Sequence, residues 1–144
     1  MTRTATALAA LVLTAGVVVS GCSSSTTETK SPEDLKSSIP VPAGVTRTVG
    51  PDPIASNGIR MHYEATGAPG PSMVAYRNAL RDKGWAMTTI VTSEGGTGGG
   101  ATYVGSQGNA YTVVDGGGFE QQTFIDICVW PEKPAEPNCT RAKR

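Results

Sequence analysis

Few residues of this chain are of the types that carry acid–base or nucleophilic chemistry. His62 is the only histidine in the 144 residues, and no Gly-x-Ser-x-Gly turn is present to expose a nucleophilic serine. Nucleophilic catalysis needs a general base beside the nucleophile. A carboxylate pair would have to come from Asp115, Glu120 and Asp126, and the sequence alone cannot show whether two of them converge. We therefore expect a protein that is not an enzyme.

Cys22 lies in a pattern that is typical of covalent lipid chemistry. The tetrapeptide Val19-Ser20-Gly21-Cys22 directly follows an apolar run over residues 5–19. It resembles the lipobox of bacterial lipoproteins. The resemblance implies that residues 1–21 are a cleaved signal peptide, that Cys22 carries a thioether-linked diacylglyceryl group, and that its new amino group is acylated. It also implies anchoring at the extracytoplasmic face of the cell membrane.

Two other interpretations of this N-terminal segment stay open. A retained transmembrane helix is disfavoured because the apolar run is shorter than the roughly 20 residues that span a bilayer. A conventional signal peptide could also be cut elsewhere and leave Cys22 unmodified. In the lipoprotein interpretation, two or three acyl chains are needed for a stable anchor, because no basic patch follows the cysteine.

The two remaining cysteines are expected to form a disulfide. Outside the cytoplasm, an even pair at close spacing typically oxidises, and three prolines between Cys128 and Cys139 stiffen the connection. A bridge over so short a loop would stabilise the fold by roughly 3 kcal/mol. Metal binding by this pair is the poorer interpretation, because only one histidine is present. We expect no metal and no cofactor.

The run Glu94–Ala101 contains enough glycine to be considered as a phosphate-binding loop. Gly96, Gly98 and Ala101 match the loose spacing of a dinucleotide-binding motif. Such a loop needs a following helix, whose free amides meet the phosphate. Residues 102–104 favour a strand instead. The run is therefore expected to be a mobile hairpin loop, and no nucleotide is expected.

Charge and length limit the class of partner and the number of domains. The chain has 12 basic and 12 acidic residues, so nucleic acid is not indicated as a partner. Residues 22–39 are rich in Ser, Thr and charges, and we expect a lipidated N-terminus and a disordered tether there. A single domain is expected over 40–140, followed by a basic tail over 141–144.

The spacing of apolar residues predicts two strands, one helix and then four strands. The helix is expected to begin with Ser72 as its cap and to end at Gly84. The strands are expected over 45–49, 59–65, 85–92, 101–105, 110–115 and 123–130, with Gly116-Gly117-Gly118 as a turn. The predicted fold class is α+β: a two-layer domain in which one helix packs on an antiparallel sheet of about five to six strands.

Alternation along two of these strands predicts which side chains are buried. In 59–65 the polar face carries His62, which we expect to be exposed beside Glu64. In 123–130 the aliphatic face is expected to meet the helix. The opposite face, which carries Cys128, is expected to lie under the proline-rich tail.

Aromatic residues on the predicted strands are the candidate ligand or partner surface. One helix is not expected to cover all of them, so some could form an exposed patch; the alternative is that they fill the core or lie under the tail. The five residues are Tyr63, Tyr103, Tyr111, Phe124 and Trp130.

The leading functional hypothesis is a membrane-anchored lipoprotein of the cell envelope that acts as a non-catalytic binding or scaffold module with an envelope protein partner. The Gly-, Ala- and Thr-rich composition is similar to that of small lipoproteins of high-GC actinobacteria, which supplies no functional residue. The alternative is a carrier of a lipid or small apolar ligand, since methionines suit adaptable pockets. Its helix–sheet cavity would be lined by Met61, Met73, Leu80 and Met87.

Overall fold

The computed structural model describes residues 29–141. The predicted signal peptide, the lipobox with Cys22, and residues 142–144 of the basic tail lie outside the described residues. The elements are α1 (Pro32–Ser37), β1 (Val45–Ile54), β2 (Gly58–Thr66), α2 (Pro69–Asp82), β3 (Ala86–Gly95), β4 (Gly98–Gln107), β5 (Ala110–Phe119) and β6 (Gln122–Trp130).

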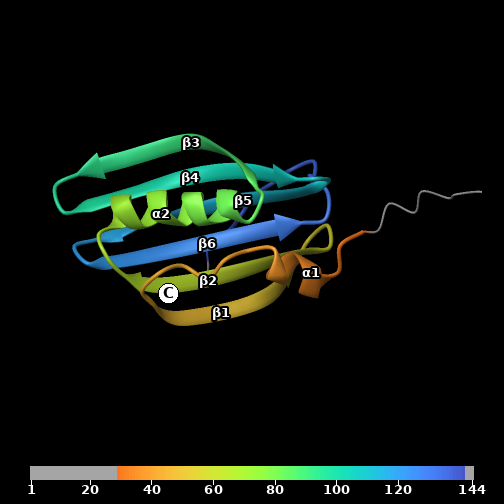
Figure 1. Cartoon of the computed structure of the whole chain (residues 1–144), viewed down its shortest axis with the longest axis horizontal. Coiled ribbons are helices and arrows are strands. Elements are labelled where there is room, and N and C mark those ends of the chain that lie inside the picture. The colour runs from red at the N-terminus through yellow and green to blue at the C-terminus, as the bar shows by residue number, and fades with distance from the viewer. Residues whose placement is uncertain (1–28, 142–144) are drawn as a thin grey trace, which may run out of the picture.

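The six strands form one antiparallel sheet in the order β1-β2-β6-β5-β4-β3 (Figure 1). Short turns make β3 to β6 a meander, because strands joined by tight turns pair antiparallel. The chain crosses the sheet through α2, which carries it from β2 to the far edge. Consequently β6 returns to pair with β2, and β1 and β3 are the two edge strands. The predicted α+β fold, with one main helix on an antiparallel sheet, is confirmed.

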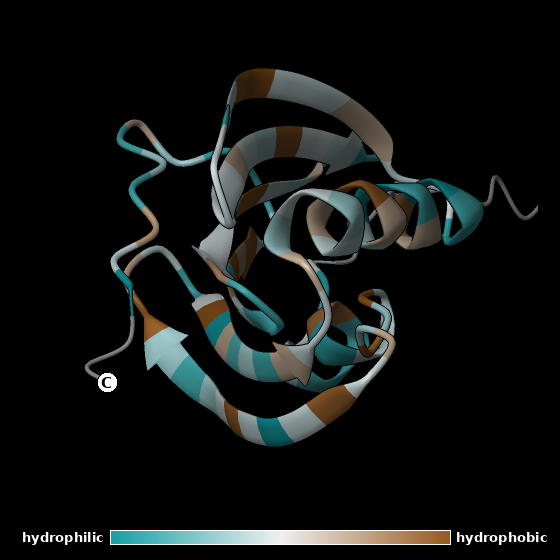
Figure 2. Cartoon of the chain, turned by 90° about the vertical axis from the view of Figure 1, so that its left-hand side faces the viewer, coloured by the Kyte–Doolittle hydropathy of each residue, from teal (hydrophilic) through white to brown (hydrophobic). Residues whose placement is uncertain are grey.

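The sheet curves strongly around α2, so that it has a concave face and a convex face (Figure 2). The helix begins at Pro69, one turn before the predicted start. Ala68 is its N-cap and makes no side-chain cap bond, so the prediction that Ser72 caps the helix is wrong. The C-terminal signal was correct, because Gly84 takes the left-handed conformation at φ 92°. The amide of Trp85 then donates to the carbonyl of Leu80 at 3.1 Å.

The segment predicted to be a disordered tether is folded over its second half. Ser31 and Asp34 form a capping box that starts α1, and these hydrogen bonds from Ser31 hold the pKa of Asp34 below its usual value. Leu35 and Ile39 are buried in the same core as α2. The tether prediction is therefore wrong for this part, because two apolar residues four positions apart are enough to dock one helical turn.

Two glycine-rich segments are strands rather than loops. β3 continues to Gly95 and β4 begins at Gly98, so only a two-residue turn separates them. Gly116-Gly117-Gly118 lies inside β5, and the turn to β6 falls at Glu120 and Gln121. β1 likewise continues to Ile54, through Pro51 and Pro53, although the strand was predicted only over 45–49. Pairing with neighbouring strands overrides the local preference of these residues for turns.

Methionine side chains fill the space between the helix and the sheet. A Cβ on Gly105 would lie 2.4 Å from the sulfur of Met87, and one on Gly116 would lie 2.6 Å from the sulfur of Met73. The glycines leave hollows in the sheet that the two flexible side chains occupy. All four residues expected to line a carrier's cavity, Met61, Met73, Leu80 and Met87, are members of this packed core.

Candidate binding surface

The convex face is organised as rows of residues that face each other across neighbouring strands. The central row carries three ionisable side chains, His62, Asp126 and Asp115. It runs through Val49, His62, Asp126, Asp115, Thr102 and Val91, from β1 to β3. The next row runs through Arg47, Glu64, Phe124, Gly117, Gly100 and Ser93. One face therefore brings together residues from all six strands.

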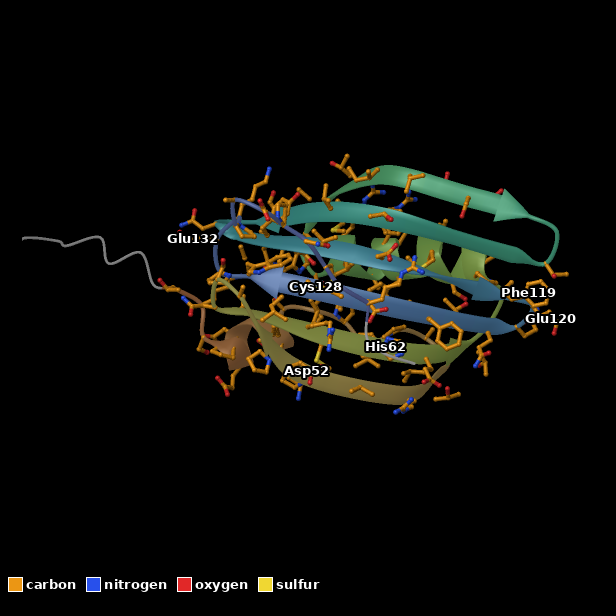
Figure 3. All side chains as sticks on the ribbon, turned by 180° about the vertical axis from the view of Figure 1, so that it is seen from behind. Asp52, His62, Phe119, Glu120, Cys128 and Glu132 are labelled. Atoms are coloured by element: carbon orange, nitrogen blue, oxygen red, sulfur yellow. A yellow bond between two sulfur atoms is a disulfide. The ribbon has the colours of Figure 1, made fainter. Side chains whose placement is uncertain are left out.

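His62 forms a buried pair with Asp126. The imidazole Nδ1 lies 2.9 Å from Oδ1 of Asp126, and the ring of Phe124 stacks on it at 6.4 Å between centroids. His62 is 4% exposed and Asp126 2%, so the prediction of a solvent-exposed histidine is wrong. Figure 3 shows this face, with His62 and Cys128 on β2 and β6.

The geometry of His62 favours a structural role. Its other nitrogen, Nε2, lies 3.9 Å from a carboxylate oxygen of Glu64. Both ring nitrogens therefore face carboxylates, which fix the orientation of the ring within the sheet. Within residues 29–141, no group of three metal-ligating side chains is close enough to hold an ion.

The residues after β6 cross the convex face as a strap, which we define as residues 131–141. The predicted disulfide is confirmed: Cys128 in β6 is bonded to Cys139 in the strap, with 5.5 Å between their Cα atoms. Arg60 donates to the carbonyl of Thr140 at 3.2 Å, and Arg141 donates to Asp115. The strap covers a second apolar cluster that contains Trp130, as expected for the Cys128 face.

The five aromatic residues predicted as a surface do not form one. Tyr63 and Tyr103 lie in the concave core, and burial raises the pKa of Tyr63 to about 12. Trp130 is buried in the cluster beneath the strap, whereas Tyr111 and Phe124 are half-buried on the convex face. Of the two alternatives, packing in the core or under the tail describes Tyr63, Tyr103 and Trp130, whereas Tyr111 and Phe124 keep part of their surface exposed.

A trough with a volume of about 450 Å³ lies on the convex face between the strap and β3. Its floor is the pair Gly100 and Gly117, which face each other across β4 and β5. Because neither glycine has a side chain, the row that starts at Arg47 has no side chains between Phe124 and Ser93. Val91 and Phe119 form part of its walls. The trough exposes backbone between apolar side chains, which suits close approach of another chain.

The most exposed apolar side chains beside this trough belong to β3 and the end of β5. Ile90 is 59% exposed, Val91 54% and Phe119 60%. In β3 every residue except Met87 is exposed. The sequence predicts this strand but not its position at the edge of the sheet, because that position depends on the strand order. The alternation of residues 86–92 contains no signal for that position.

Comparison with protein-family models, with curated proteins and with solved structures found no match to this chain. Among the described residues, no helix has the length and apolar character needed to cross a membrane.

Proposed function

We propose that this protein is a lipid-anchored module of the bacterial cell envelope that binds protein, without catalysis, through the open edge of β3. The observation that supports this proposal is the exposure of a ten-residue strand at the end of the sheet. An edge strand presents a row of backbone donors and acceptors that can pair with another chain.

The composition of β3 strengthens the argument. Natural edge strands are usually protected by proline, by lysine or other charges, or by shortness. β3 contains no proline and no lysine, and Glu94 is its only charged residue. A typical strand has about five or six residues, so β3 offers an unusually long template. One bulge, between Thr89 and Val91, interrupts its pairing with β4.

The lipid at Cys22 would hold this edge close to the membrane. The described fold begins with the cap of α1 at Ser31, so residues 22–30 connect the lipid to the domain. A connection of this length spans at most roughly 30 Å when fully extended. The binding partner is therefore proposed to be another protein at the membrane surface.

Intact cells offer a direct test of the proposed surface. A photo-crosslinking amino acid replaces Val91 on β3 in one variant, and the exposed Thr48 on β1 in a matched control. We expect Val91 to give discrete crosslinked protein products and Thr48 to give none. Equal products from both positions, or none from Val91, would contradict the proposed surface.

The anchor is tested separately by fractionation. Cys22→Ala should yield a protein that no longer sediments with membranes and that lacks the mass of the acyl groups. Intact-mass spectrometry of the wild-type protein should show cleavage before Cys22. A variant that remains in the membrane fraction would rule out the lipid anchor, while leaving the β3 surface to be judged by crosslinking.

A further inference from the structure

We infer that the occupant of the β3 edge is β3 of a second copy of this chain, paired antiparallel, so that one sheet continues through both copies. This inference rests on the proposed function and names the partner at the same surface. An isologous contact needs a patch that is complementary to itself under a two-fold rotation. The charges and side chains of β3 have this property.

The charges beside the β3 edge have opposite signs at its two ends, one from β3 itself and two from α2. Glu94, near the end of the strand, lies beside Gly70 at the start of α2. Near the beginning of the strand, Arg81 donates to the carbonyl of Met87 at 3.2 Å, and Arg77 donates to the hydroxyl of Thr89 at 3.1 Å. Antiparallel pairing brings the glutamate of each copy to the arginines of the other. Parallel pairing would place glutamate against glutamate.

A register centred on the bulge keeps the side chains before and after Ile90 on their own faces of the extended sheet. Successive residues of a strand alternate between faces, and the bulge at Ile90 shifts this alternation by one residue. If the two-fold axis passes between Ile90 and Val91, Glu94 faces Met87 of the other copy and Ser93 faces Thr88. The bulges then meet at the axis, where both copies contribute apolar side chains.

The same symmetry is compatible with anchoring in one membrane. A two-fold axis normal to the sheet places both α2 helices on one side of the extended sheet. α1 packs in the same concave core as α2, through Leu35. Both copies of α1 therefore lie on this same side of the extended sheet, which is compatible with two lipid anchors in one bilayer.

The strength of the contact follows from its size. Stable interfaces bury about 1,200–2,000 Å², more than two paired strands of this length provide alone. The dimer is therefore expected to be weak in solution. Anchoring raises the effective concentration of the copies and shifts the equilibrium toward pairing.

Disulfide trapping in membranes tests both the pairing and its register. Full-length Thr88→Cys and Ser93→Cys chains, each with a different epitope tag, are co-expressed and oxidised. Directly opposite residues in antiparallel strands have Cα atoms about 4.5–5.5 Å apart, within the range a disulfide needs. The mixture should form a crosslinked dimer carrying both tags, whereas Thr88→Cys alone or Ser93→Cys alone should not.

Charge reversal provides a second readout that does not depend on cysteine geometry. Glu94→Lys on the trapping background should reduce the crosslinked dimer about fivefold, as expected for loss of a surface ion pair, and Arg81→Glu should do the same. The double reversal Glu94→Lys with Arg81→Glu should restore it. Failure of the rescue would overturn the antiparallel arrangement.

The outcomes separate this inference from the proposed function. If the Thr88→Cys and Ser93→Cys mixture gives no more dimer than either variant alone, the second copy is not the occupant. If photo-crosslinking at Val91 then captures a different protein, the proposed β3 surface is supported and a second copy is excluded as its occupant. If Val91 captures nothing, both the proposed β3 surface and the dimer are contradicted.

Discussion

The two edges of this sheet, β1 and β3, are equally long but differ in how they are protected. β1 contains Pro51 and Pro53 and has two irregularities in its pairing with β2. Its charged side chains are tied back to β2 by two ion pairs, Arg47–Glu64 at 2.7 Å and Asp52–Arg60 at 2.8 Å. β3 has one bulge, no proline and a single charge.

The two edges of one sheet therefore differ in the features that prevent strand addition. Proline removes a backbone donor, and bulges bend an edge away from an incoming strand. At β1 both devices are present, so strand addition is blocked there. The absence of proline and lysine from β3 suggests that its exposure is functional, because the same chain shows the means to prevent it.

The largest expected effect comes from removing the strap's covalent attachment. The double substitution Cys128→Ser with Cys139→Ser should lower the free energy of unfolding by roughly 3 kcal/mol, because a disulfide restricts the unfolded chain. Urea denaturation measures this change, and reduction of the wild-type protein should reproduce it.

The variant without the disulfide also tests whether the strap supports one edge of the sheet more than the other. The strap holds Arg60 through Thr140, and Arg60 holds Asp52 of β1. Hydrogen exchange should therefore accelerate in β1 more than in β3 once the strap is released. Equal acceleration in the two edges would show that the strap does not support β1 selectively.

An intermediate effect is expected where a glycine is enclosed in the interior of the sheet. Gly116→Ala would place a Cβ 2.6 Å from both the sulfur of Met73 and the carbonyl oxygen of Phe124. We expect a loss of about 1–3 kcal/mol, as for other overpacked cores. The matched control is Gly95→Ala at the end of β3, where nothing lies within 4 Å of the new Cβ.

Thermal and urea unfolding of the two glycine variants give the result. Gly95→Ala should stay within about 0.5 kcal/mol of the wild-type value. A similar loss in both variants would mean that the end of β3 is as constrained as the interior of β5, contrary to its role as an accessible edge.

The smallest effect on stability is expected from removing one protective residue of β1. Pro53 is exposed on the edge strand, so Pro53→Val should change the free energy of unfolding by about 0.5 kcal/mol or less. It should nevertheless increase concentration-dependent association, because the new amide can pair with another strand. Light scattering over a concentration series measures this. An unchanged profile would show that the bulges alone protect β1.

Local signals in the sequence were sufficient for much of the fold. The alternation in 59–65 and the left-handed stop at Gly84 predicted β2 and the end of α2, because both depend on neighbours along the chain. The pairing of Cys128 with Cys139 followed from their spacing. The capping box at Ser31 and Asp34 was also present in the sequence, and it could have revealed α1.

The candidate site could not be predicted in the same way. Burial of His62 depends on Asp126, which is far away in sequence and becomes its neighbour only when β6 returns to β2. The trough depends on Gly100 lying opposite Gly117. Both glycines favour turns locally, and only the register of the strands shows that they form its floor.

The attachment of the segment after α1 determines where a mechanical load would enter the domain. The indole of Trp85 donates to the carbonyl of Ser38 at 2.9 Å, and the hydroxyl of Tyr76 donates to that of Pro40 at 3.1 Å. A pull on the residues before α1 would therefore reach the helical layer through these two bonds, and β4 through the bond that Lys30 donates to Gln107 at 2.8 Å.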